Sequence, residues 1–178
     1  MSTTPRLPSA IADRQADFPG IMAHQPQLGD AFWTLYGEVM ARGIVSQKLK
    51  ETARMRNARV TGCGFCRNVR YAKAQEEGLD ENQIAQITDD HQTSGLDERQ
   101  KLVLQYTDAF LLGPAELTAE VQEAMASNFT NAELVELTMA LALYLGMAKP
   151  LIAFGTEPES MDTTVLPTPD PDANPLAV

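Results

Sequence analysis

The chain has 178 residues, of which 44% are hydrophobic, so one domain with a substantial core is expected. Its 24 acidic and 14 basic residues give a formal net charge of -10, which repels phosphate backbones and anionic lipids. We therefore expect no nucleic acid and no membrane surface among its partners. The start lacks a secretory signal, and the most apolar run, 137–148, is too short to span a bilayer and stops at Lys149-Pro150. These features predict a soluble, cytoplasmic protein.

Residues 1–26 carry four prolines, which predict an extended N-terminal arm wrapped around the domain, with one turn of helix near 9–17. Beyond the arm the pattern is helical, and no segment predicts a strand. The polar segment 89–95 is a predicted loop. Apolar periodicity, capping residues and glycine stops place helices at 28–42, 46–59, 63–78, 80–88, 96–112, 118–128 and from 130 onward. This succession predicts an all-α fold.

The last predicted helix is hydrophobic on nearly every side from Leu134 through Met147. Such a helix must be buried in a large core or between subunits, and in a chain of this size we expect a homo-oligomer, whether dimer, trimer or hexamer. After Gly155 the composition changes to Pro, Asp and Thr, which by themselves form neither helix nor packed core. The expected organisation is therefore an N-terminal arm at 1–26, a helical domain at 27–155 and a Pro-rich, acidic C-terminal tail at 156–178.

The only two cysteines, Cys63 and Cys66, form a C-x-x-C pair. Because this spacing lets the two sulfurs meet, the pair can cycle between dithiol and disulfide, which predicts redox chemistry. A structural staple is less favoured, since closing so short a loop removes little entropy from the unfolded chain. At the opening turn of the predicted helix the sulfurs would lie near unpaired backbone N–H groups, which stabilise a thiolate.

Two charged residues are expected beside the cysteines. Arg70 follows Cys66 by one helical turn, so its guanidinium would lie on the same face and favour the ionised form of that sulfur. Glu51 lies on the preceding helix, whose antiparallel return would bring its carboxylate near Arg70 or Cys66. Glu51 is therefore a candidate proton carrier or ion-pair partner. The candidate catalytic residues are Cys66, Cys63, Glu51 and Arg70.

A glutamate, a gap, a C-x-x-C and the alanine-rich stretch 72–79, in this order and spacing, resemble the AhpD-like proteins of the carboxymuconolactone decarboxylase superfamily. The resemblance extends more loosely over about 25–155. It implies an oligomeric, AhpD-like helical bundle that reduces hydroperoxides through its cysteine pair, with electrons from a dihydrolipoyl or similar dithiol donor. It also implies that Cys66 attacks the peroxide, that Cys63 resolves the product and that Glu51 belongs to a proton relay.

One residue departs from the family pattern. The relay histidine of these proteins falls on Arg70, and an arginine stays protonated, so it cannot shuttle protons at neutral pH. Arg70 could still lower the pKa of Cys66 and hold Glu51 by a charge-assisted hydrogen bond, while Glu51 itself or water serves as general base. The leading hypothesis is therefore a thiol-dependent peroxidase or disulfide reductase with an altered relay.

Other interpretations of the same residues stay open. A lyase or isomerase of the decarboxylase branch would act on a small lactone or carboxylate, with Arg70 as anion clamp and Glu51 as acid or base. A non-catalytic oligomeric scaffold would bind neighbours through its terminal arms. Glu51 and Arg70 could form a plain structural ion pair. The cysteines could be simple packing or half of a zinc site, but no spacing completes a zinc site, and we expect no metal and no cofactor.

The aromatic residues Phe32, Trp33 and Tyr36 are interpreted as packing in the core or between subunits rather than as a substrate pocket. His24 and His91, the only histidines, both fall in predicted loops. Exposed loop histidines seldom have a specific role, so neither is expected to reach the site.

Overall fold

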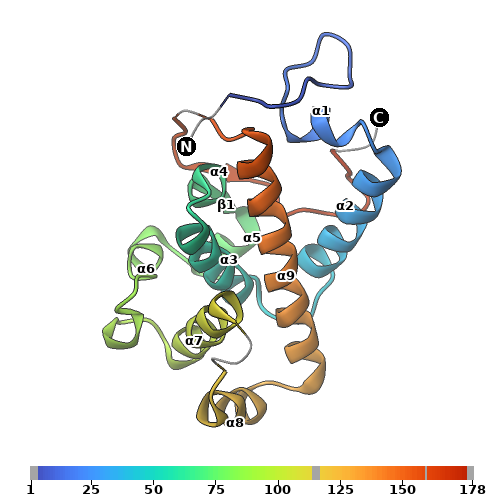
Figure 1. Cartoon of the computed structure of the whole chain (residues 1–178). Coiled ribbons are helices and arrows are strands. Elements are labelled where there is room, and N and C mark those ends of the chain that lie inside the picture. Colours follow the sequence, from blue (N-terminus) through green and yellow to red (C-terminus); the bar gives the residue numbers. More distant parts are fainter. Residues whose placement is uncertain (1–3, 114–116, 159, 176–178) are drawn as a thin grey trace.

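The computed structural model describes residues 4–113, 117–158 and 160–175, which are mostly helical and place both ends of the chain toward the top of Figure 1. A short 3-10 turn lies at His91–Thr93, and two short strands, β1 (Val69–Tyr71) and β2 (Thr164–Leu166), form a parallel pair. The helices are α1 (Phe18–Met22), α2 (Pro26–Ala41), α3 (Gln47–Thr61), α4 (Gly64–Asn68), α5 (Ala72–Glu76), α6 (Glu81–Ala85), α7 (Glu98–Leu112), α8 (Ala119–Asn128) and α9 (Asn131–Phe154). The all-α prediction is confirmed, apart from this small sheet.

The boundaries of α3 follow from its caps. Ser46 Oγ accepts a hydrogen bond from the backbone N–H of Leu49 (3.3 Å), so Ser46 is the predicted N-cap. At the other end Gly62 takes the left-handed conformation (φ 74°), which glycine adopts without steric cost. The helix therefore ends directly before the first cysteine, and the cysteine pair begins a new element.

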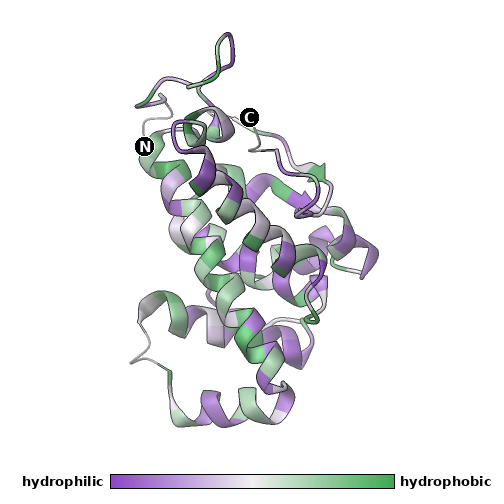
Figure 2. Ribbon diagram, turned by 90° about the vertical axis from the view of Figure 1, so that its right-hand side faces the viewer, coloured by the Kyte–Doolittle hydropathy of each residue, from purple (hydrophilic) through white to green (hydrophobic). Residues whose placement is uncertain are grey.

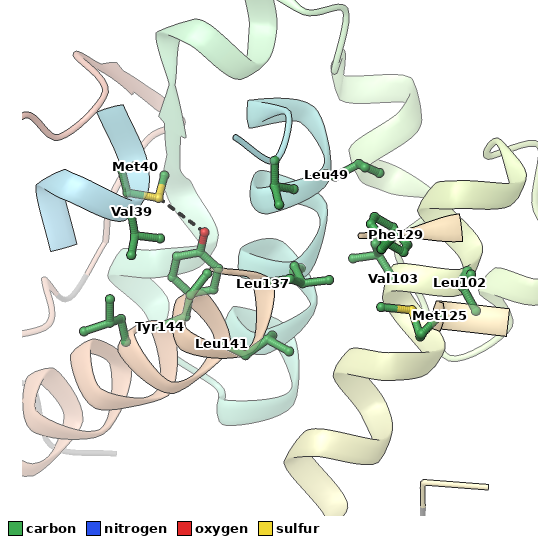
Figure 3. Packing of buried hydrophobic residues seen from close by; sticks show 14 of the residues in the cluster. Val39, Met40, Leu49, Leu102, Val103, Met125, Phe129, Leu137, Leu141 and Tyr144 are labelled. Carbon is green, nitrogen blue, oxygen red and sulfur yellow. Dashed lines mark hydrogen bonds between the residues drawn. The ribbon is translucent and has the colours of Figure 1, made fainter. Parts of the chain in front are cut away.

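The main hydrophobic core lies where α2, α3, α7, α8 and α9 meet. Figure 3 shows Tyr144 of α9 beside Val39 and Met40 of α2, with its hydroxyl donating a hydrogen bond to the Met40 sulfur (3.3 Å). Burying one large apolar side chain stabilises the fold by about 1.5–3 kcal/mol. Helix α3 runs through this core with residues 49–58 all buried. Its buried charged side chains are each paired with an opposite charge, which such depth requires.

Helix α9 is the longest helix among the described residues, and its ribbon is mainly white to green in Figure 2. This helix is long and apolar enough to cross a membrane. The core helix of a soluble protein can have the same length and composition. The apolar run stops at Lys149-Pro150, but the helix itself continues to Phe154. Pro150 removes one backbone hydrogen bond, but the extra turn buries Leu151 beside the cysteines.

One chain does not bury α9 all round. Its inner face packs against α2, α3 and α8, while its outer face leaves Val135 (65%) and Met139 (42%) exposed. The outer face of α2 likewise exposes Leu28 (62%) and Leu35 (44%), two residues of the apolar stripe that predicted this helix. Some apolar residues of α2, such as Val39 and Met40, are therefore buried in the core, whereas Leu28 and Leu35 lie at the surface.

The predicted helix at 63–78 is wrong in its middle, where β1 separates α4 from α5. The segment is extended because the tail supplies a parallel partner, with Val69 opposite Thr164 and Tyr71 opposite Leu166. Valine and tyrosine favour strands, but three residues give no recognisable alternation. The partner strand lies so far along the chain that local pattern could not predict it.

The C-terminal tail returns over α2. The indole N–H of Trp33 donates a hydrogen bond to the carbonyl of Asp170 (3.0 Å). A side chain at Gly37 would collide with the backbone of Pro171, so the absence of a Cβ permits this close approach. The tail is thus held against the helical domain of its own chain.

The N-terminal arm contacts the end of α9, where the backbone N–H of Arg6 donates to the carbonyl of Phe154 (2.9 Å). The predicted helical turn near 9–17 is wrong. The first helix is α1, which begins after Asp17 because the carboxylate of Asp17 accepts a hydrogen bond from the N–H of Gly20 (2.8 Å).

Candidate functional site

The two cysteines lie at the start of α4, directly after α3 ends. Cys63 is the N-cap residue, and its Sγ accepts a hydrogen bond from the backbone N–H of Cys66 (3.2 Å). Both are free thiols with little exposure, 0% for Cys63 and 6% for Cys66. They pack in a hydrophobic cluster with Ala58, Ala148 and Leu151. The short turn between the helices therefore holds the two side chains against each other in an apolar setting.

The pKa values of the two thiols are shifted in opposite directions. A hydrogen bond from the Cys66 side chain, joined by that from the Cys66 backbone, lowers the pKa of the Cys63 thiol although burial opposes its ionisation. The same side-chain hydrogen bond raises the pKa of Cys66, and burial raises it further. The expectation of a lowered pKa at Cys66 is therefore wrong. The thiolate is favoured on Cys63, and the proton stays on Cys66.

Arg54 connects the dithiol to α3. Its buried guanidinium donates to both carboxylate oxygens of Glu51 (2.6 Å each), to the carbonyl of Cys66 (2.8 Å) and to that of Val69 (2.6 Å). Burial opposes the charge, but Glu51 keeps the pKa of Arg54 well above its usual value. Sequence reasoning missed Arg54, although its position three residues after Glu51 on one helix predicts such an ion pair.

A pair of tyrosines extends this network. The backbone N–H of Tyr71 donates to the Glu51 carboxylate (3.4 Å), and the Arg54 guanidinium lies 4.9 Å from the centre of the Tyr71 ring. The hydroxyls of Tyr71 and Tyr36 are 3.2 Å apart. Burial raises the pKa of both tyrosines, so both stay protonated and able to donate a hydrogen bond.

Residues 26–91, which contain both cysteines, match the carboxymuconolactone decarboxylase family. A crystal structure from Agrobacterium tumefaciens, of a protein of unknown function described as a candidate antioxidant defence protein AhpD, superposes with a TM-score of 0.66. That match has 18% identity and covers 79% of this chain and 97% of the other. The family match thus covers residues 26–91, and the likeness to the Agrobacterium structure shows that the chain has an AhpD-like fold.

Two relatives of this chain come from two strains of Mycobacterium tuberculosis, and both are uncharacterised proteins. Each is 32% identical to this chain over 115 residues, which is 60% of this chain. The chain spans 40% of the length of these curated relatives.

Arg70, at the position where the superfamily resemblance places a relay histidine, lies away from the dithiol. Its guanidinium binds the Glu81 carboxylate (2.7 and 3.1 Å) and the carbonyls of Arg67 and Val69. We expected Arg70 to contact Cys66 and Glu51, and this expectation is wrong: among the described residues its side chain makes no hydrogen bond to either. The reason is that Arg70 belongs to β1. Residues 66 and 70 are therefore not one turn apart on a continuous helix, and their side chains do not share a helix face. Arg54 takes the expected place beside Glu51.

The expectation that His91 is an exposed loop residue is also wrong. It is 3% exposed, and its Nε2 lies 3.1 Å from a carboxylate oxygen of Asp108, which also binds Arg56. His24 is exposed and contacts the carbonyl of Pro8 (3.0 Å). Within the described ranges neither histidine reaches the cysteines, and no group of three or more His, Cys, Asp or Glu could hold a metal ion.

The aromatic residues of α2 have different surroundings. Tyr36 is a core residue and Phe32 packs against the core, as expected. Trp33 also packs there but lines a cavity of about 700 Å³, together with Phe65 and Tyr71. Phe65 stands between the two cysteines in the C-x-x-C motif, so this cavity adjoins the dithiol.

Proposed function

We propose that the chain is a thiol-dependent peroxidase or disulfide reductase whose reacting groups are Cys63 and Cys66. The observation that carries the proposal is the hydrogen bond from the backbone N–H of Cys66 to the Cys63 sulfur (3.2 Å), which holds the two thiols together. In this arrangement the pKa of Cys63 is lowered and that of Cys66 is raised, which favours a thiolate on Cys63. A thiolate is the nucleophilic form of cysteine, and a neighbouring thiol is needed to resolve its oxidised product. The match of residues 26–91 to the carboxymuconolactone decarboxylase family and the AhpD-like fold support a peroxidase-like or a decarboxylase-branch role.

In the proposed reaction the Cys63 thiolate attacks the terminal oxygen of a hydroperoxide. The O–O bond breaks, the sulfur becomes a sulfenic acid, and the alcohol leaves after it takes up a proton. Cys66 then attacks the Cys63 sulfur, which forms the disulfide and releases water. A lipoyl-type or small dithiol reduces this disulfide by thiol–disulfide exchange and is itself oxidised to a disulfide. Two electrons therefore pass from the donor dithiol to the peroxide in each cycle.

Glu51 and Arg54 have a positioning role in this proposal. Both oxygens of the Glu51 carboxylate accept hydrogen bonds from Arg54, so the two side chains hold each other in place. Arg54 in turn binds the carbonyl of Cys66, which fixes the second cysteine relative to the first. The proton that the leaving alcohol needs is supplied by Cys66 or by solvent.

The test uses wild type, Cys63→Ser and Cys66→Ser, each treated with one equivalent of hydroperoxide before thiol titration and mass spectrometry. Wild type should lose both free thiols and turn over with dihydrolipoamide. Cys66→Ser should stop at a sulfenic acid on Cys63, trapped by dimedone, whereas Cys63→Ser should leave Cys66 reduced. The superfamily resemblance by itself implies the reverse outcome for the two variants. Unchanged thiols in wild type and no turnover with any dithiol would refute the proposal.

The lyase or isomerase alternative has less support, because the cation proposed as its anion clamp, Arg70, is already bound to Glu81. It predicts that Cys66→Ser keeps full activity on a lactone or carboxylate, whereas the redox proposal predicts loss of peroxide turnover. The two functions are therefore separated by one variant.

We also propose that the chain forms a homo-oligomer through the outer faces of α2 and α9. These two helices pack together, and each leaves large apolar side chains exposed, Leu28 and Leu35 on α2 and Val135 and Met139 on α9. Light scattering should give a molar mass that is a multiple of the 19.4 kDa of one chain, and Val135→Asp should lower this molar mass. A monomeric wild type at micromolar concentration would contradict this expectation and favour neither redox nor lyase chemistry.

A further inference from the structure

The cavity beside the dithiol is assembled from five separate parts of the chain. The arm and α1 contribute Phe18, α2 contributes Trp33, α9 contributes Met147, and the tail contributes Leu166 and Pro169. Phe65 and Tyr71 complete the wall on the side of the C-x-x-C motif. Phe18, Met147 and the tail residues all lie outside 26–91, so most of the wall is separate from the segment that matches the family.

The tail is held in place as one wall of this cavity. Strand β2 pairs with β1, which sets Leu166 opposite Tyr71. Farther along, the Thr168 hydroxyl accepts a hydrogen bond from the backbone N–H of Lys73 (3.2 Å), and Trp33 donates to the carbonyl of Asp170 (3.0 Å). Hydrogen bonds thus attach this wall to β1, to α5 and to α2.

The cavity and the dithiol share a wall. Phe65 and Met147 pack against the hydrophobic cluster that contains Cys63 and Cys66. Both of these side chains also line the cavity, as does Leu151 of the same cluster. A molecule in the cavity would therefore contact the side chains that cover the two sulfurs.

The lining selects the kind of molecule that fits. Most of it is aromatic, aliphatic or proline, and the charged residues among the lining are Asp17 and Asp170, both acidic. Because no cation lines the cavity in the described part of the chain, a carboxylate would be repelled and left unpaired. The volume of about 700 Å³ is typical of sites for organic molecules, whereas a peroxide as small as H₂O₂ is close in size to water and needs no such space.

We propose that the arm and the tail build a binding site for a bulky, uncharged, apolar organic molecule, held between Trp33 and Leu166 and against Phe65. This inference rests on the proposed function in one respect: for a peroxidase the bound molecule is the organic part of the hydroperoxide, and the cavity is the specificity site. Binding itself requires no reaction, so the site can be tested apart from the chemistry.

Trp33 is the only tryptophan of the chain, so its fluorescence reports directly on the cavity. The full-length protein is titrated with 2-phenyl-2-propanol, the unreactive alcohol of cumene hydroperoxide, and with benzoate as an anion of similar size. The alcohol should give a saturable change in fluorescence, and benzoate should bind at least about tenfold more weakly, because its charge would be buried without a partner. A linear response to the alcohol, or equal binding of benzoate, would overturn the proposal.

Strand β2 offers a matched pair of variants. Leu166 lines the cavity, whereas its neighbour Val165 is 52% exposed and does not. Leu166→Asp should weaken binding of the alcohol at least about tenfold by placing a charge in the cavity. Val165→Asp, the same change one residue away, should stay within about twofold of wild type, as an exposed site allows. Equal binding by both variants would refute the assignment of the site.

A second variant covers the case in which Leu166→Asp fails to fold, as judged by circular dichroism. Ala173→Phe narrows the cavity without adding a charge and should also weaken binding of the alcohol. Undiminished binding in this variant would place the alcohol elsewhere.

Activity then separates this inference from the proposed function. If the alcohol binds as expected but neither cumene hydroperoxide nor H₂O₂ is reduced, the proposed function is refuted and the binding site in the cavity is supported. If both peroxides are reduced equally well by wild type and Leu166→Asp, the dithiol chemistry stands and the cavity has no role in specificity. If Leu166→Asp loses turnover with cumene hydroperoxide but keeps it with H₂O₂, both are supported.

Discussion

The dithiol and the cavity beside it are built in opposite ways. The hydrogen bonds that connect the dithiol to α3 join residues close in sequence, since Arg54 is three residues from Glu51 and twelve from Cys66, while α9 adds apolar packing. The cavity is closed by contacts such as that of Trp33 with Asp170, which lie 137 residues apart. In the proposed site this difference separates two properties: the hydrogen bonds around the sulfurs act on their pKa values, and the returning tail forms a wall of the cavity.

The largest effect is expected when the local contacts are broken. Arg54→Met leaves the Glu51 carboxylate buried without its partner and takes donors from the carbonyls of Cys66 and Val69. Breaking one side of a buried ion pair costs about 3–5 kcal/mol. Urea unfolding should show this loss, whereas the control Arg67→Met, at an exposed position, should stay within about 0.5 kcal/mol of wild type. Equal small losses would mean that the pair at Glu51 is not needed to hold the dithiol.

The next effect concerns the acidity of Cys63. In wild type its pKa is lowered, so Cys63 stays ionised, and is alkylated by iodoacetamide, at pH values where an ordinary thiol is protonated. Cys66→Ala removes the side chain that donates to Cys63, so the pKa should rise and alkylation should begin about one pH unit or more higher. Cys66→Ser keeps a hydroxyl donor and should fall between the two. A profile that is identical in all three proteins would contradict the assigned thiolate.

A smaller effect tests the long-range contacts. Trp33→Phe keeps the aromatic ring but loses the N–H that donates to Asp170, at a cost of about 1 kcal/mol. Hydrogen exchange should become faster in peptides covering 164–175, while the pH profile of Cys63 alkylation stays unchanged. A shift in that profile would show that the two regions are coupled rather than separate.

The smallest effect lies where the two regions meet. Glu157 of the tail accepts a hydrogen bond from the backbone N–H of Gly64, and its charge acts to raise the pKa of both thiols. Glu157→Gln keeps an acceptor but removes the charge, so the pKa of Cys63 should fall by a few tenths of a unit, measured from the same alkylation profile. Glu120→Gln, an exposed carboxylate on α8, is the control and should change nothing. A rise in the pKa of Cys63 would reverse the assigned sign.

Much of the fold could be predicted because its signals are local. Ser46, Thr118 and Thr130 were predicted as the residues that begin three helices, and each caps its helix in the structure. The prediction failed at 69–71, where a strand from the tail replaces helical hydrogen bonds with those of a parallel pair. The same failure misplaced Arg70, whose side chain was positioned by assuming that the helix continued.

By itself the sequence determined an all-α fold, the positions of most helices and the placement of a cysteine pair at the start of a helix, because caps, periodicity and spacing act over a few residues. Only the tertiary structure decided that Arg54 rather than Arg70 binds Glu51, that Cys63 rather than Cys66 is the more acidic thiol, and that the tail and arm enclose a cavity. These depend on burial and on contacts between segments far apart in the chain, which no local pattern specifies.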